Sequence, residues 1–128
     1  MLLNLTDISN EPLQSQIVRQ IRAKILAGEL AATDSLPSIR VLAKENQVSV
    51  ITVQRAYEIL LRQDLIHSRR GKGFFVSDLS ASVKKTIAKQ RLDESLETHL
   101  IAALAEGLST KEIEQMVSML LQRNGASQ

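Results

Sequence analysis

The stretch that decides the fold is residues 38–76, which read SIRVLAKENQVSVITVQRAYEILLRQDLIHSRRGKGFFV. Ser38 and Ser49 each precede a run whose apolar residues recur at helical spacing, and serine is favoured immediately before a helix. Two short apolar runs, residues 65–68 and 74–77, flank the basic segment RRGKG. The pattern predicts two short helices joined by a tight turn, then a two-stranded hairpin with a cationic tip.

A helix pair followed by a basic hairpin can hold duplex DNA at two places. One helix enters the major groove, and the hairpin reaches the flanking phosphates or the minor groove. The stretch therefore predicts DNA binding by the starts of both helices and by the hairpin tip. The candidate DNA-binding residues are Ser38, Arg40, Ser49, Val50, Ile51, Thr52, Gln54, Arg55, Arg69, Arg70, Gly71, Lys72 and Gly73.

The start of the second helix is the place where base edges come closest. Ser49 and Thr52 can donate hydrogen bonds to phosphate oxygens, and the amide of Gln54 matches the N6 and N7 edge of adenine. Val50 and Ile51 are apolar at the tip of an exposed helix, which contact with thymine methyl groups would explain. Packing against the preceding helix is the alternative, and it is left open above all for Val50.

The arginines of the two helices differ in how well DNA binding explains them. Arg40 lies in the first turn of its helix, where a positive charge opposes the helix dipole, so a phosphate partner explains it better than solvation does. Arg55 and Arg62 are equally well explained by a solvated helix face, since Glu58 is within reach of both.

The hairpin tip has two interpretations. Gly71 and Gly73 permit a positive φ and let backbone N–H groups approach a phosphate. The alternative is a plain turn that basic residues keep soluble. Directly after a helix-turn-helix, the tip favours a DNA-binding wing.

The flanking segments are expected to be helical as well. Residues 1–10 look extended or irregular, and the helix that follows would be capped by Asn10 and stopped by Gly28. Beyond the hairpin, residues 79–82 form a linker of mostly small residues before a long helix. Ser109 and Glu112 match a capping box, which predicts a last helix after a break at Gly107.

The two C-terminal helices carry apolar stripes that they cannot bury alone. A second copy of the chain is the expected cover, so we expect a homodimer. The predicted dimerisation residues are Leu96, Leu100, Ile101, Leu104, Ile113, Met116, Val117 and Leu120.

Composition limits the class of protein. At 128 residues, with 44% hydrophobic and 2% aromatic residues, the chain fits one small domain with an appendage and an aliphatic core. It has no cysteine, no long apolar run and no export signal, so we expect a protein of the reducing cytoplasm without a membrane segment. The net charge is only +2, and all of the excess lies in residues 1–78.

Nothing in the sequence points to catalysis. His67 and His99 have no acidic or cysteine partner at metal-ligand spacing, and no glycine loop has nucleotide-binding spacing. The expectation is a protein that is not an enzyme and that uses no metal or cofactor.

At this point the residues resemble a known family. The spaced motifs ILAGEL at residues 25–30, LPSIRVLA at residues 36–43, VS at residues 48–49 and RGKGFFV at residues 70–76 are similar to the GntR-type transcription regulators. The resemblance implies a winged helix-turn-helix that binds a palindromic operator as a dimer. It also implies DNA contacts for Arg40, Ser49, Thr52 and Gly71.

Three departures from the family pattern stand out. The family often has Pro-Gly in the connector where this chain has Ala32-Thr33, and glycine is common where Asp64 stands. Many members differ at Val50 and Ile51, so the operator sequence cannot be transferred.

The C-terminal fifty residues, with two helices around Gly107, resemble the YtrA subgroup, which implies a small helical dimerisation appendage.

The prediction is a mainly α protein with a small β-hairpin: a winged helix-turn-helix DNA-binding domain at residues 1–78 and a two-helix dimerisation appendage at residues 79–128. Its function would be that of a dimeric, sequence-specific repressor on a palindromic operator of double-stranded DNA. An architectural or weakly specific DNA-binding protein is one alternative, and a protein-interaction module on a winged-helix fold is another. A small-molecule effector of unknown identity is left open, with a site that would be shallow or at the dimer interface.

Overall fold

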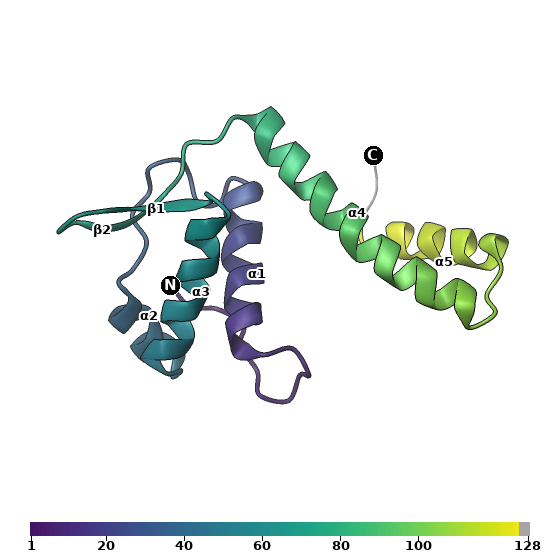
Figure 1. Cartoon of the computed structure of the whole chain (residues 1–128), viewed down its shortest axis with the longest axis horizontal. Coiled ribbons are helices and arrows are strands. Elements are labelled where there is room, and N and C mark those ends of the chain that lie inside the picture. The colour runs from purple at the N-terminus through teal and green to yellow at the C-terminus, as the bar shows by residue number, and fades with distance from the viewer. Residues whose placement is uncertain (126–128) are drawn as a thin grey trace. The chain divides into compact units, whose positions relative to one another are not determined.

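A computed structural model describes residues 1–125 of the chain. These residues are mainly helical with one small β-hairpin, which confirms the predicted fold class (Figure 1). The elements are α1 (Leu13–Leu26), α2 (Ile39–Asn46), α3 (Val50–Arg62), β1 (Ile66–Arg69), β2 (Gly73–Val76), α4 (Ala81–Ala105) and α5 (Thr110–Arg123).

The chain divides into two compact units, Met1–Lys85 and Thr86–Gln128. The predicted linker at residues 79–82 is partly wrong, because Ala81 and Ser82 already lie in the first turn of α4. None of the helices in residues 1–125 is long and apolar enough to cross a bilayer.

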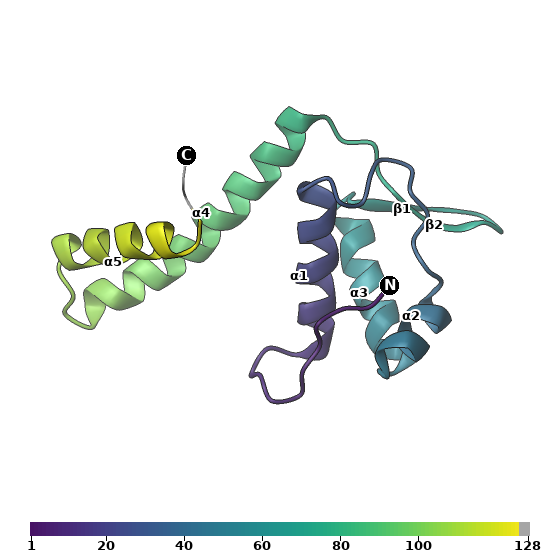
Figure 2. The ribbon, with the colours of Figure 1, turned by 180° about the vertical axis from the view of Figure 1, so that it is seen from behind.

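The core of the first unit is built where α1, α2 and α3 meet. In Figures 1 and 2, α1 and α3 lie side by side, and α2 packs against α3. The apolar side of α1 is buried, and the inner side of α3 packs against it. The buried apolar side chains of the three helices are Ile17, Val18, Ile21, Ile25, Leu42, Ala43, Val53, Ala56, Tyr57 and Leu60. Ile39 of α2 and Leu61 of α3 are only half-buried.

The starts of α2 and α3 are capped as predicted. The Ser38 hydroxyl accepts a hydrogen bond of 3.2 Å from the N–H of Val41, and the Ser49 hydroxyl accepts one of 3.1 Å from the N–H of Thr52. Each cap satisfies an N–H group that has no partner inside its helix, which fixes where α2 and α3 begin.

Both helices end in the same backbone arrangement. The N–H of Val48 bonds the carbonyl of Ala43 (3.0 Å), and the N–H of Leu65 bonds that of Leu60 (3.1 Å). These are the long bonds of Schellman motifs, whose left-handed position is usually glycine. Here Gln47 (φ 55°) and Asp64 (φ 58°) occupy it.

The connector between α1 and α2, residues 27–38, also contains a residue in the left-handed conformation. Thr33 has φ 68°, a conformation that favours glycine, so a threonine makes this turn. The connector then pairs with β2, because Leu36 donates to the carbonyl of Phe74 (2.9 Å) and Val76 donates to the carbonyl of Asp34 (2.8 Å).

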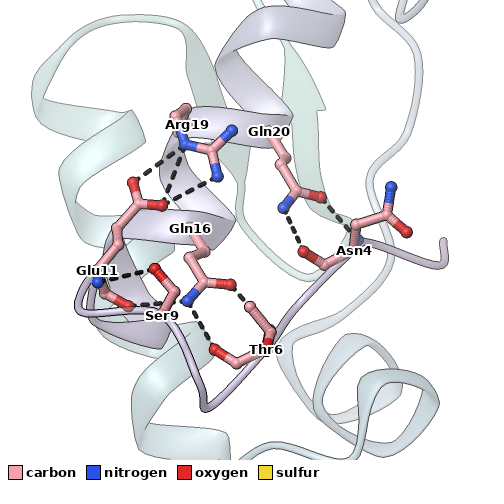
Figure 3. A network of polar contacts seen from close by, with 7 residues as sticks. All are labelled: Asn4, Thr6, Ser9, Glu11, Gln16, Arg19 and Gln20. Atoms are coloured by element: carbon pink, nitrogen blue, oxygen red, sulfur yellow. Dashed lines mark hydrogen bonds and ion pairs between the residues drawn. The ribbon is translucent and has the colours of Figure 1, made fainter.

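Residues 1–10 are irregular, as predicted, but side chains of α1 hold this segment in place (Figure 3). The buried Gln16 amide accepts from the N–H of Thr6 (3.0 Å) and donates to the carbonyls of Thr6 (2.9 Å) and Glu11 (2.8 Å). Gln20 makes the same two-way exchange with Asn4, at 2.8 Å for each bond.

The predicted Asn10 cap of α1 is wrong. The capping position is Pro12, which has no side-chain hydrogen bond, and Asn10 lies in the preceding bend. The bonds of Gln16 to Thr6 and Glu11 hold the chain in this place instead, and Arg19 adds a two-pronged bond to Glu11. This bond lowers the pKa of the Glu11 carboxyl.

The hairpin is antiparallel, with Ile66 opposite Val76 and Arg69 opposite Gly73. Both strands lie one residue closer to the tip than predicted. Leu65 is excluded from β1 because its N–H closes the end of α3, and Gly73 joins β2 at the tip.

The second unit consists of α5 and most of α4, joined by residues 106–109. The predicted capping box is present: Ser109 accepts from the N–H of Glu112 (3.1 Å), and the Glu112 carboxylate accepts from the N–H of Ser109 (2.9 Å). Neither helix contains a fully buried residue, and only a few positions such as Leu100 and Ile113 are half-buried.

Candidate nucleic-acid interface

The first turn of α3 presents two hydroxyl groups together. The Ser49 and Thr52 hydroxyl oxygens are 2.7 Å apart, so one of them donates to the other. Two hydroxyls hold two protons, and this contact uses only one. The second proton is available to a phosphate oxygen in front of the helix, where the helix dipole also favours an anion.

Val50 and Ile51 lie beside these hydroxyls and are exposed to solvent. Their exposed fractions are 47% and 55%, so neither is packed into the interface with the preceding helix. Branched apolar side chains gain nothing from water at a helix tip. A DNA major groove would offer them thymine methyl groups.

Gln54 and Arg55 occupy the next part of the outer face of α3, and both are exposed. The Gln54 amide donates a long bond of 3.5 Å to the Glu58 carboxylate, so that carboxylate is engaged by an amide. Among residues 1–125, Arg55 and Arg62 form no ion pair with it. Both arginines are exposed, so a solvated helix face and contact with DNA stay open as interpretations.

Arg40 is the exposed cation at the start of α2. It follows the Ser38 cap by two residues, and the first turn contains no acidic side chain to offset its charge. No salt bridge engages it within the described part of the chain. A positive charge in this place is unfavourable for the helix on its own and favourable once a phosphate is in contact.

The hairpin tip is built by glycines in conformations that other residues rarely adopt. Gly71 has φ 75° and Gly73 has φ 104°, and the N–H of Lys72 closes the turn on the carbonyl of Arg69 (2.9 Å). Arg69, Arg70 and Lys72 are all exposed and none has an acidic partner in residues 1–125. The tip therefore concentrates three uncompensated positive charges.

Aromatic residues, which were not among the predicted site residues, support the β1–β2 hairpin that forms the wing. The chain has one tyrosine and two phenylalanines, and all three lie in α3 and β2. The ring of Phe74 meets that of Tyr57 edge-on at 4.9 Å, which ties the hairpin to α3. Phe75 lies at 4.9 Å from the Arg69 guanidinium and stacks with His67 at 6.0 Å.

Tyr57 also links α3 to the segment before α2. Its hydroxyl donates a bond of 2.7 Å to the carbonyl of Pro37, and burial raises the pKa of this hydroxyl. The clustering of a scarce residue type was the available clue to this role. Which partner each ring meets depends on strand register, and the sequence does not provide that.

Residues 1–125 contain no group of three or more His, Cys, Asp or Glu side chains that could hold a metal ion. His67 is engaged with Phe75, and His99 is exposed on α4.

Comparison with known proteins gives a family match. The family model described as "Bacterial regulatory proteins, gntR family" matches residues 13–76, from the first residue of α1 to the last of β2. Among curated proteins, the HTH-type transcriptional regulator YhcF of Bacillus subtilis is 31% identical over 81% of this chain and 84% of its own length. The HTH-type transcriptional repressor YtrA of the same species is 29% identical over 85% of this chain and 84% of its own length.

Solved structures agree with this match. A GntR family transcriptional regulator from Listeria monocytogenes has a TM-score of 0.74 at 26% identity, covering 90% of this chain and 98% of that chain. YtrA from Sulfolobus acidocaldarius, a GntR-family transcription factor, has a TM-score of 0.59 at 28% identity, covering 74% and 97%. The DNA-binding domain of AraR, in complex with operator ORX1, has a TM-score of 0.53 at 26% identity, covering 60% and 95%.

The relatives are transcriptional regulators, and the matched segment is the winged helix-turn-helix with its uncompensated cations. The chain belongs to the gntR family of DNA-binding transcriptional regulators, in its YtrA-like subgroup.

Proposed function

We propose that the protein is a dimeric repressor that binds a palindromic operator through two copies of its winged helix. The observation that carries the proposal is the pair of cationic, solvent-facing surfaces on one unit: the tips of α2 and α3, and the wing. The cations of these surfaces have no acidic partner within residues 1–125, so an outside anion is the expected partner.

In the bound state, α3 would enter the major groove. Ser49 and Thr52 would bind phosphate, whereas Val50, Ile51 and Gln54 would face base edges. The remaining candidates contact the backbone. They are Ser38, Arg40, Arg55, Arg69, Arg70, Gly71, Lys72 and Gly73.

The second unit supports the dimer. Apolar side chains predicted for the interface are exposed in the single chain, among them Leu104 at 50% and Met116 at 54%. Water contact of so many apolar groups is unfavourable, and a second copy related by a two-fold axis can cover them. Two-fold symmetry then requires two operator half-sites about one helical turn apart.

Repression is supported by likeness to proteins named as repressors. The Bacillus subtilis YtrA is named a transcriptional repressor, and AraR has been solved on its operators. Repression would follow from occupancy of promoter DNA, and a protein with this function would work in the cytoplasm. A small-molecule effector would bind at the dimer interface, in a depression of about 520 Å³ on α5. Its lining is Met116, Met119, Leu120, Gln122 and Arg123, of which Met116 and Leu120 belong to the predicted interface. Calorimetry with candidate ligands, together with operator affinity in their presence, tests this last step.

Selection of bound duplexes from random oligonucleotides tests the function. We expect a palindromic consensus, bound ~10³-fold or more tightly than random duplex. Equal affinity for all duplexes would favour the architectural alternative. Binding to no duplex at low salt would favour a protein-interaction module. A reporter gene with the selected operator in its promoter should be expressed less when the protein is present.

The dimer is tested on the full chain by sedimentation. Leu104→Asp should shift it to a monomer and weaken binding to the two-half-site operator, because a buried carboxylate opposes the interface. Leu92→Asp is the matched control, since Leu92 is also an exposed leucine of α4 but lies outside the predicted interface. A wild-type chain that stays monomeric at micromolar concentration would contradict the dimer.

A further inference from the structure

The two faces of the hairpin carry different side chains. Successive residues of a strand point to opposite faces. On the inner face, Ile66 and Val76 are buried and Phe74 contacts Tyr57. The outer face carries His67, Arg69 and Phe75, which have no part in the core.

On the outer face, the guanidinium of Arg69 lies over the ring of Phe75, 4.9 Å from its centroid. The register explains this contact, since Arg69 pairs with Gly73 and Phe75 pairs with His67. Gly73 has no side chain, so nothing separates Arg69 from the ring two residues further along β2. A guanidinium over an aromatic face at this distance forms a cation–π interaction.

Phe75 is held through both its ring and its backbone. The His67 ring stacks on it at 6.0 Å with an interplanar angle of 27°, and Phe75 forms a β-bridge with Ser35 of the connector. The Phe75 residue is half-buried. The ring is therefore a fixed platform, whereas Arg70 and Lys72, within the described residues, have no aromatic or acidic partner.

We propose that Phe75 is a positioning residue that holds Arg69 in the orientation used for DNA contact. Arginine loses much rotamer freedom when a ligand fixes it, and a side chain ordered in advance loses less on binding. The inference rests on the proposed function, since it requires the wing to touch DNA. On this proposal, Phe75 on the outer face contributes to DNA affinity, whereas Phe74 on the inner face contributes to the stability of the fold.

The test is a double-mutant cycle on the selected operator, with affinity measured by fluorescence anisotropy. Phe75→Leu removes the ring and keeps an apolar side chain, and we expect a loss of about three- to tenfold in affinity, the range for ordering one long side chain. In the Arg69→Ala background, the same Phe75→Leu change should cost no further affinity. Phe75→Tyr, which keeps an aromatic face, should restore wild-type binding.

Phe74→Leu is the matched control, because it removes the neighbouring ring from the other face. It should lower the urea midpoint through loss of the Tyr57 contact, and its effect on affinity should be the same with and without Arg69→Ala. Phe75→Leu should leave the urea midpoint closer to that of the wild type.

Each other outcome has a definite meaning. Equal losses from Phe75→Leu in both backgrounds would show that the ring acts through the fold alone, which overturns the inference. No loss from Phe75→Leu beside a clear loss from Arg69→Ala would overturn it and leave the proposed function intact. Unchanged binding by Arg69→Ala would overturn it as well, because Arg69 would then make no DNA contact. If the wild type binds no duplex, the proposed function itself fails and this inference with it.

Discussion

The hydroxyl of Tyr57 donates a hydrogen bond of 2.7 Å to the carbonyl oxygen of Pro37. Tyr57 lies in α3 and Pro37 lies directly before the Ser38 cap of α2, so one partly buried polar contact joins the two helices that we propose to face DNA.

Tyr57→Phe should destabilise the fold while leaving the ring contacts in place. The Pro37 carbonyl would lose its partner in a partly buried place, for which we expect a cost of about 1–2 kcal/mol in the free energy of unfolding. Urea unfolding of the full chain measures this value. An unchanged midpoint would mean that water replaces the hydroxyl without loss.

The stability difference between the wild type and Tyr57→Phe should depend on pH in the alkaline range. Burial raises the pKa of Tyr57, so the folded state favours the neutral hydroxyl. The stabilisation is complete below the unfolded-state pKa of about 10 and is lost as the pH rises above it. The difference in stability between the wild type and Tyr57→Phe should therefore narrow above this pH. A constant difference across that range would contradict the burial of the hydroxyl.

Arg40→Ala should have opposite effects on stability and on DNA binding. Removal of a positive charge from the first turn of α2 should raise stability slightly, by up to about 1 kcal/mol, since the charge opposes the helix dipole. Operator affinity should fall, and the slope of its logarithm against that of salt concentration should decrease by about one, as for one lost phosphate contact.

Lys44→Ala is the control for that experiment. Lys44 stands in the last turn of the same helix, where its charge suits the dipole, so its removal should lower stability. It is not among the predicted DNA-binding residues, and the salt slope should stay the same. Equal slopes for the wild type and Arg40→Ala would show that Arg40 does not hold a phosphate.

Contact of Val50 and Ile51 with thymine methyl groups can be tested from the DNA side. Uracil lacks the methyl group of thymine, so replacing single thymines of the operator by uracil should weaken wild-type binding at the contacted positions. Val50→Ala or Ile51→Ala should remove that sensitivity, each at its own position. Both residues are exposed in the free protein, so the variants should stay folded. Sensitivity that is retained in both variants would exclude the contact.

The capping box of α5 predicts a weakening at acidic pH. The backbone N–H of Ser109, followed by its hydroxyl, lowers the pKa of Glu112. The contribution of the carboxylate is thus present above its ordinary pKa of about 4.3 and is lost as the pH falls through the lower folded-state value. Glu112→Gln should lower the melting temperature at neutral pH, and this gap should close at acidic pH. Melting curves by circular dichroism measure it, and a pH-independent gap would contradict the box.

The sequence predicted what depends on local pattern. The Ser38 and Ser49 caps and the Ser109 box follow from residues within three positions of each other, and the hairpin follows from two short strands around one glycine turn. The Asn10 cap failed because the Gln16 side chain bonds the backbone of Thr6 and Glu11, which no periodicity reveals.

The site was only partly predictable for the same reason. Hydroxyls, cations and glycines indicate a candidate DNA-binding surface by their chemistry and their order along the chain. The roles of the aromatic rings depend on register: Phe74 and Phe75 are adjacent in sequence, yet they contact different elements because a strand alternates its faces.

Gln47 and Asp64 hold left-handed positions that close α2 and α3, at a conformational cost that glycine would not carry. A more stable variant of this regulator should therefore be accessible by substitution at these two positions. Glycine at either place should relieve about 1 kcal/mol of strain, offset in part by a more disordered unfolded chain. Such a substitution should raise the stability of the fold without changing the proposed DNA-binding residues. A stable regulator of this kind would suit use as a biosensor component.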